Sequence, residues 1–374
     1  MNSFELLDVF LFIGVSQGLF LSIALQTVTN KNKSANKILS ILLFIAAFML
    51  FGRILYLKYT DPLLSQIAFS ADTVIFIFGP LVYLYIRRLT FFEQKEYRLS
   101  LYHYIPAIVL QAFIIWSYFY TPEEFKLIQK TYHIDLIFKY RFIQISAITS
   151  HFYYLYKSYK LVKSYQKQEK KNLSYSQNIT SFLKSFITII TVIILLWLIG
   201  LSNKLFKVNL SFINYDMIWI SIPVFVYFVG FYSLNQPEVF RIQLKTEKKK
   251  ITKKRLDEKV LLQLQEKLNL LMQDEKIYLD NQLTLRSLAE KLNTSSNNLS
   301  WLLNSVYNCT FYEYINRSRI KTFITKIENG EHKEYTVLAL SIDSGFNSKS
   351  TFNKAFKAEM NDTPTNYIKN LNIN

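Results

Sequence analysis

The chain has 374 residues, a formal net charge of +17 and 51% hydrophobic residues, with 31 Phe and 26 Tyr against only 8 Gly. This apolar and aromatic content is too high for an ordinary soluble helical protein, and the positive charge suits nucleic acid or anionic lipid. The single cysteine, Cys309, excludes an intramolecular disulfide framework and a Cys-rich zinc site, and the four histidines are scattered. The sequence therefore predicts no metal and no other cofactor, and we expect Cys309 to be a buried small residue.

Seven apolar stretches, each about 20 residues long as a membrane-spanning helix requires, occupy the first 235 positions. They cover residues 4–28, 37–57, 67–89, 102–120, 136–159, 180–201 and 216–234. The alternative is a set of buried helices in a soluble protein. Seven such stretches separated by short polar loops favour membrane spans.

The charges of the connecting loops predict an orientation. Thirteen Lys and Arg residues lie in the odd-numbered loops or at the span ends that adjoin them, and five lie in the even-numbered loops. The positive-inside rule therefore places the odd-numbered loops in the cytoplasm and the N-terminus outside. After seven spans the C-terminal region is cytoplasmic, where the DNA of a bacterium is accessible. Trp116, Trp197 and Trp219 then lie toward the outer ends of their spans, which predicts an aromatic belt.

Charged residues inside membrane spans are candidates for a signal-sensing site. The candidates, all at the outer ends of spans two, three, five and seven, are Arg53, Asp72, Arg141 and Asp216, with Lys139 beside them. The alternative is that these side chains reach the headgroups or pair with one another, and their positions near the span ends favour it. The sequence contains no HExxH, no GxSxG and no intramembrane aspartate pair, so it predicts no enzyme.

The composition changes after Pro237, where a linker begins. Residues 245–259 form a basic run, which predicts contact with anionic lipid, added non-specific affinity for DNA, or a solvated tether. The following helix, 256–272, carries a short seam of leucines at coiled-coil spacing: Leu261, Leu264, Leu268 and Leu271. This seam predicts either a homodimer or an amphipathic helix packed on its own domain, and two heptads are too few to decide.

Two helix-turn-helix patterns follow. In the first, Leu285, Leu288 and Leu292 share one helical face, Asn293 occupies the turn and Ser295 can cap the next helix. In the second, the turn lies at Gly345-Phe346, and Phe352 and Phe356 share the inner face of the helix after it. Residues 311–327 read as one long amphipathic helix that joins the two units.

From about residue 281 to 370 the sequence resembles the C-terminal domain of AraC/XylS-type transcriptional regulators. The residues that carry the resemblance are Leu288, Ala289, Leu299, Ser300, Phe311, Tyr314, Ile315, Arg319, Ile320, Gly345, Phe346, Ser348, Ser350, Phe352, Phe356, Lys357, Thr363, Pro364 and Tyr367. The resemblance implies two helix-turn-helix units set into successive major-groove segments, and a regulator of initiation that often recruits RNA polymerase. The chain departs from the family at Ser341 and Phe323, where Ala is usual, at Asn361, where Gly is usual, and at Trp301, usually polar or basic.

The chemistry of base recognition selects the DNA-binding candidates. Asn bonds adenine with two hydrogen bonds, Lys donates to guanine, and Ser contacts several bases. In the first unit the candidates are Ser296, Asn297, Asn298, Trp301 and Asn304. In the second unit they are Lys349, Ser350, Asn353 and Lys354, with Lys357 expected on a phosphate. Arg319, in the linking helix, is expected to be structural.

The sequence therefore predicts an all-α chain in three parts: a seven-span transmembrane bundle at 1–236, a linker at 237–280 and a cytoplasmic domain with two helix-turn-helix units at 281–374. We expect a DNA-binding transcription regulator of the bacterial inner membrane, with double-stranded DNA, the lipid bilayer and an unidentified signal ligand as partners. One alternative is a membrane receptor or transporter-like protein whose C-terminal helical domain docks a protein partner. Another is a bundle that only anchors the regulator. The layout also resembles membrane-bound AraC-type regulators.

Overall fold

The computed structural model is all-α, as the sequence predicts, with two strands of two residues each. It describes residues 5–27, 32–58, 62–92, 97–117, 119, 121, 124, 127, 131, 133–175, 178–206, 216–235, 244–245 and 257–371. The chain divides into two compact units. The first combines Met1–Lys163 with Ile179–Thr246, and the second combines Ser164–Asn178 with Glu247–Asn374.

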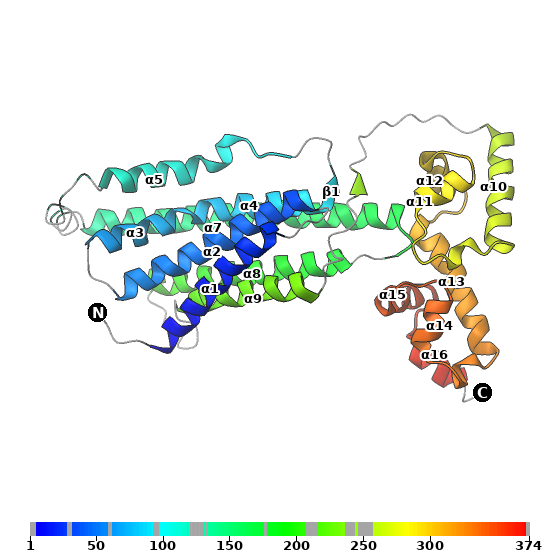
Figure 1. Cartoon of the computed structure of the whole chain (residues 1–374). Helices are drawn as coiled ribbons and strands as arrows, with labels where there is room; N and C mark the ends of the chain where they lie inside the picture. Colours follow the sequence, from blue (N-terminus) through cyan, green and yellow to red (C-terminus); the bar gives the residue numbers. More distant parts are fainter. Residues whose placement is uncertain are drawn as a thin grey trace. The chain divides into compact units, whose positions relative to one another are not determined.

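The first unit is a bundle of helices that run alongside one another (Figure 1). Its elements are α1 (Leu6–Thr27), α2 (Lys33–Lys58), α3 (Pro62–Thr73), α4 (Ile75–Thr90), β1 (Phe91–Phe92), η1 (Leu101–Tyr104), α5 (Ile105–Ser117), the greater part of α7 (His133–Asn172), α8 (Asn178–Phe206), α9 (Asp216–Asn235) and β2 (Leu244–Lys245), which pairs in parallel with β1. The predicted stretch 67–89 is divided into α3 and α4. The predicted stretch 136–159 is part of a longer helix, because α7 continues to Asn172.

Three described helical segments are long and apolar enough to cross a membrane: Leu6–Thr27, Lys33–Lys58 and Ile179–Asn203. Two shorter apolar helices span Leu101–Trp116 and Met217–Tyr232. Large apolar side chains also point outward, with Phe20 and Ile23 each 66% exposed and Phe142 72% exposed. Such a surface favours lipid contact over water. Seven membrane spans therefore remain a prediction, of which three are supported by helix length and composition.

The packing of α1, α2 and α9 forms one core of the bundle. Leu11, Leu50, Ile54 and Trp219 are buried together there. Gly14 allows this approach, because a Cβ on it would lie 2.7 Å from side-chain atoms of Leu50 and Pro223. Trp197 and Trp219 are both buried, whereas Trp116 is exposed. The predicted aromatic belt is therefore wrong for two of the three tryptophans, whose large rings fill the bundle interior.

The second unit contains the C-terminal helices. They are α10 (Glu258–Gln273), η3 (Ile277–Leu279), α11 (Leu285–Lys291), α12 (Ser296–Ser305), α13 (Phe311–Glu328), η4 (Glu331–Lys333), α14 (Val337–Asp343), α15 (Lys349–Met360) and α16 (Pro364–Leu371). α13 confirms the predicted linking helix and contributes to two cores. Phe311 and Ile315 belong to the first core, with α10, α11 and α12. Ile320, Phe323 and Ile327 belong to the second, with α14 and α15.

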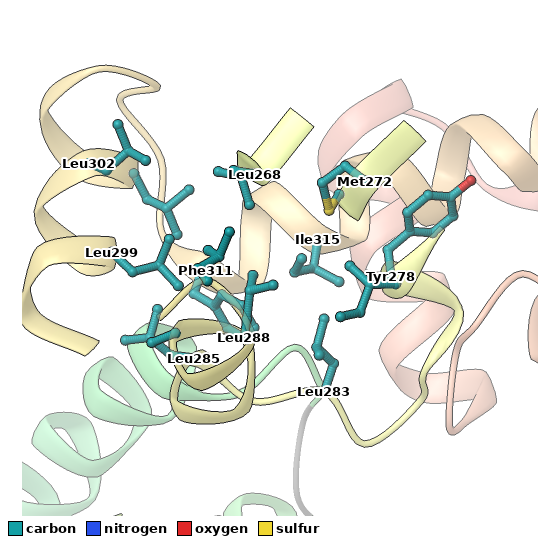
Figure 2. Close-up of a cluster of buried hydrophobic side chains, with 14 of the residues drawn as sticks. Leu268, Met272, Tyr278, Leu283, Leu285, Leu288, Leu299, Leu302, Phe311 and Ile315 are labelled. Carbon is teal, nitrogen blue, oxygen red and sulfur yellow. The ribbon is translucent and has the colours of Figure 1, made fainter. Parts of the chain in front are cut away.

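The leucine seam of α10 is part of the first core. Leu264 and Leu268 are buried, and Leu261 and Leu271 pack against the same cluster. Figure 2 shows Leu268 and Met272 directed toward the same cluster as Leu288 of α11 and Ile315 of α13. The prediction of a helix packed on its own domain is confirmed. The homodimer stays a prediction, and these leucines already pack in the core of their own unit. Most of the basic run 245–259 lies outside the described residues.

Candidate nucleic-acid interface

The first helix-turn-helix unit is formed by α11, a short turn and α12. The side chain of Thr284 caps α11, with the Ser287 backbone N–H donating to Thr284 Oγ1 at 3.1 Å. Asn293 has φ 52°, a left-handed conformation that Asn tolerates well, so the predicted turn residue is confirmed. Ser295 Oγ then accepts from the Asn298 backbone N–H at 3.1 Å and caps α12 as predicted.

The second unit is formed by α14, a turn at Gly345 and α15. Gly345 has φ 94°, and a Cβ on it would lie 2.7 Å from the carbonyl oxygen of Tyr278 and 2.8 Å from the Cα of Leu279. Both neighbours are backbone atoms, so glycine is required by space as well as by conformation. Ser348 Oγ accepts from the Thr351 backbone N–H at 3.3 Å and caps α15.

The inner faces of the two units are built from different side chains. Leucines of α11 and α12 fill the first, as Figure 2 shows for Leu285, Leu288, Leu299 and Leu302. Phenylalanines fill the second, where the ring of Phe352 lies 4.6 Å from that of Phe323 and 5.3 Å from that of Phe346, between centroids. Phe323 is thus accommodated at a family alanine position by an aromatic cluster.

The outer face of α15 is polar, basic and exposed. Every predicted DNA-binding side chain of this helix is exposed: Lys349, Ser350, Asn353, Lys354 and Lys357. The inner face is anchored by Phe352 and Phe356, both buried. A helix with a fixed inner face and an exposed polar outer face has the form needed for a DNA major groove.

The outer face of α12 is more enclosed. Asn297 and Asn304 are exposed, while Ser296, Asn298 and Trp301 are half-buried. Asn298 Nδ2 donates to Thr294 Oγ1 at 3.3 Å, and Asn304 Nδ2 donates to the Ser300 carbonyl at 2.6 Å. Two of the candidate amides are therefore engaged locally, and they would have to exchange these bonds to contact a base.

A pocket of about 290 Å³ opens on this face of α12. It brings together three of the predicted side chains with four others, the full lining being Lys171, Asn172, Leu285, Asn297, Ser300, Trp301 and Asn304. No sequence pattern indicated Lys171 and Asn172, which lie at the end of α7. They belong to the same compact unit as α12 although 125 residues separate Asn172 from Asn297.

Arg319 is structural, as expected. Its side chain is fully buried, with Nε donating to the Tyr278 carbonyl at 2.6 Å and Nη2 to the Asp280 carbonyl at 2.7 Å. Burial lowers the pKa of the guanidinium to about 10, so it stays charged at neutral pH. Buried in this way, Arg319 ties α13 to the segment before α11.

Cys309 is buried, as expected, and burial raises the pKa of its thiol. A raised pKa lowers the thiolate fraction and with it the reactivity of the sulfur. In the part of the chain that the structure describes, no three His, Cys, Asp or Glu side chains come together in a way that could hold a metal ion.

The predicted sensing residues are only partly described. The guanidinium of Arg53 lies 5.2 Å from the ring centroid of Trp219 and 5.5 Å from that of Tyr56. Arg141 is half-buried on α7. The side chains of Asp72 and Asp216 lie outside the described residues, as does that of Lys139.

A buried ion pair joins α1 to α2, and it was not among the sequence-based predictions. Lys58 Nζ lies 2.6 Å from Asp8 Oδ2, and both side chains are almost completely buried. Asp8 is near the start of α1 and Lys58 ends α2. Opposite charges at the two ends of consecutive antiparallel helices are the signal that would have predicted this pair.

Residues 288–370 match a family model described as a helix-turn-helix domain, of the AraC type. The match runs from α11 to α16 and covers less than a quarter of the chain. No curated protein and no solved structure matches the chain.

Proposed function

We propose that this chain, whose residues 288–370 form an AraC-type helix-turn-helix domain, is a membrane-embedded regulator of transcription that binds specific DNA sequences through α12 and α15. The observation that carries the proposal is the construction of α15, with a buried aromatic inner face and an exposed polar and basic outer face. α13 joins this helix to a second unit of the same design. Two such helices on one rigid connection suit successive segments of a major groove.

The exposed side chains of α15 and α12 have different roles in DNA recognition. Lys349 and Asn353 read base edges, since an ammonium donates to guanine and an amide pairs with adenine. Lys357 contacts a phosphate and contributes affinity without sequence preference. Ser350 and Lys354 complete the surface of α15. On α12 the readers are Ser296, Asn297, Asn298, Trp301 and Asn304.

The first unit holds the regulator in the bacterial inner membrane. The three long apolar segments and the outward apolar side chains support this part of the proposal. The loop charges support seven spans, an outer N-terminus and a cytoplasmic C-terminal domain. In that position the domain has access to DNA and to RNA polymerase, and no enzymatic activity is assigned to it.

The bundle receives the signal at the end where Asp8 pairs with Lys58. Loss of one partner of a buried ion pair strongly destabilises the fold around it, because the other charge is left buried and unpaired. A ligand that competes for Asp8 or Lys58 would therefore shift the packing of α1 and α2. Arg53 lies on α2 as Lys58 does, and its guanidinium faces the ring of Trp219 near the start of α9. Asp72, Arg141 and Asp216 are further candidates for the ligand site. The rival is a bundle that anchors and does not sense.

DNA selection with the full chain in lipid nanodiscs tests the proposal. We expect sequence-preferring binding whose logarithm falls linearly with the logarithm of salt concentration. The double variant Lys349→Ala, Asn353→Ala should lose base preference, while Lys321→Ala, on an exposed position of α13, should retain it. A protein that binds no DNA but captures a protein partner would support the docking alternative. Labelling that finds the C-terminus outside the cell would exclude regulation.

A further inference from the structure

The described part of the connection between α7 and α8, residues 173–175, is buried in the DNA-binding unit. Leu173, Ser174 and Tyr175 are 3%, 0% and 8% exposed. They belong to the segment Ser164–Asn178, which forms one compact unit with Glu247–Asn374. Connections between helices normally lie on the surface, because buried backbone groups need hydrogen-bond partners. The burial of this connection therefore requires partners in the DNA-binding unit.

Ser174 obtains these partners from three residues of that unit. Its backbone N–H and its Oγ donate to the Leu283 carbonyl at 3.3 Å and 2.7 Å. Its carbonyl accepts from Asn316 Nδ2 at 2.9 Å and from Arg319 Nη1 at 3.1 Å, and its Oγ accepts from Arg319 Nη2 at 3.1 Å. Every polar group of Ser174 is thus used. Next to it, Leu173 forms an antiparallel bridge with Thr284.

The pocket on the outer face of α12 brings the end of α7 beside the predicted readers of that helix. Lys171 and Asn172, in the last turn of α7, line the same pocket as Asn297, Trp301 and Asn304. These α12 positions are spaced by four and three residues, so they share one face of the helix. A major groove is about 12 Å wide, and one α-helix with its side chains is about 10–12 Å across. A groove that admits this face of α12 has no room for the end of α7.

We propose that residues 169–175 form an autoinhibitory strap. While Ser174 is seated on Leu283, Asn316 and Arg319, the end of α7 lies beside the reading face of α12 and keeps a DNA groove from reaching it, although Asn297 and Asn304 are open to solvent. Release of the strap makes that face available to DNA. This inference rests on the proposed function, since masking regulates binding only if α12 reads DNA.

The strap also connects the bundle to α12 by a route that does not pass through the linker at 237–280. α7 is one helix, His133–Asn172, whose residues up to Lys163 belong to the bundle unit. A change in the seating of α7 in the bundle therefore acts on Ser174 through a continuous helix. The predicted readers of α15 are all exposed, whereas three of the five on α12 are half-buried.

A disulfide that can be formed and then reduced tests the strap. Opposed residues in an antiparallel pair have Cα atoms about 4.5–5.5 Å apart, which a disulfide can span. The full chain in nanodiscs would carry Leu173→Cys and Thr284→Cys in a Cys309→Ala background. The oxidised protein should bind its selected DNA at least about tenfold more weakly than the same protein after reduction, a typical size for coupling between two sites. Leu173→Cys alone should not respond to oxidant.

A releasing variant tests the opposite direction. Leu173→Asp places a charge at a buried apolar position and should unseat the strap, which raises DNA affinity by about tenfold. Ser164→Asp introduces the same charge at an exposed position of the same segment and should leave affinity unchanged. Neither position lies in α12 or α15.

The outcomes separate the two proposals. If the oxidised and reduced proteins bind DNA equally, or if the cysteines do not cross-link, the strap is wrong while the regulator stands. If neither the reduced protein nor Leu173→Asp prefers any DNA sequence, the proposed function itself is wrong.

Discussion

The two helix-turn-helix units of this protein share a design and differ in how they connect to the rest of the chain. Each has a serine that caps its second helix and a left-handed residue in its turn, Asn293 in the first and Gly345 in the second. The first unit has a leucine core that includes α10, and its outer face lines a pocket with residues of α7. The second has an aromatic core of its own and an exposed outer face.

This difference indicates a division of roles. The proposed strap, far away in sequence, packs on the first unit, so under our proposal the availability of this unit can be regulated. The second unit is built from contacts among α13, α14, α15 and α16, and the predicted readers of α15 are exposed. One exposed reading helix is sufficient for weak, salt-dependent attraction to DNA, and specific binding requires both.

The largest expected effect is from removal of the aromatic core of the second unit. Phe352→Ala should destabilise this unit by about 3–5 kcal/mol, because Phe352 is fully buried between Phe323 and Phe346 and leaves a cavity. Hydrogen exchange on the full chain should show faster exchange in α14 and α15. Protection of α11 and α12 should persist, and an equal loss there would mean that the two cores form one cooperative unit.

The turn residues should respond differently to substitution. Gly345→Ala should cost about 3 kcal/mol, since the added Cβ meets backbone atoms and the left-handed conformation is strained. Asn293→Gly should change stability by less than about 1 kcal/mol, because glycine adopts the same conformation freely. Protection of the backbone amides of α12 and α15 from hydrogen exchange measures the two changes in stability. An equal response of the two turns would contradict the steric argument.

The reading residues should respond according to the state of the strap. Asn353→Ala should cost about 1–3 kcal/mol of specific binding whether or not the strap is seated. Asn297→Ala should have an effect of that size only in the Leu173→Asp background, in which the face of α12 is available. Titration of selected DNA measures these costs when each variant is compared with its parent, once in the wild-type chain and once in the Leu173→Asp background. Lys357→Ala serves as the comparison, with a uniform loss for all sequences and a smaller salt dependence.

The helix caps should give the smallest and most similar effects. Ser295→Ala and Ser348→Ala each remove a side-chain acceptor from the first turn of a reading helix, so each should cost about 1 kcal/mol. Exchange at the first amides of α12 and α15 measures the loss. If Ser348→Ala proved much more damaging than Ser295→Ala, the hydroxyl of Ser348 would have a further role, since it also bonds Thr351 Oγ1.

The helical character of the chain, the two helix-turn-helix units and the linking helix α13 could be predicted from local sequence patterns. These features depend on contacts within a few residues, so they leave a local pattern: apolar residues at helical spacing, capping serines, and Asn293 and Gly345 at the turns. The candidate readers of α15 could be selected for the same reason, because the face opposite a buried stripe is the outer face.

The packing partners of the helices could not be predicted from local sequence patterns. The leucines of α10 fit a dimer seam and a domain core equally well until the core was seen to bury them. Trp197 and Trp219 fit a membrane surface equally well until they were found inside the bundle. Ser174 lies 145 residues before Arg319, and a serine in a polar loop has the same local pattern whether water or a guanidinium satisfies it. Long-range hydrogen bonds have no sequence period, which is the physical reason that the strap was visible only in the fold.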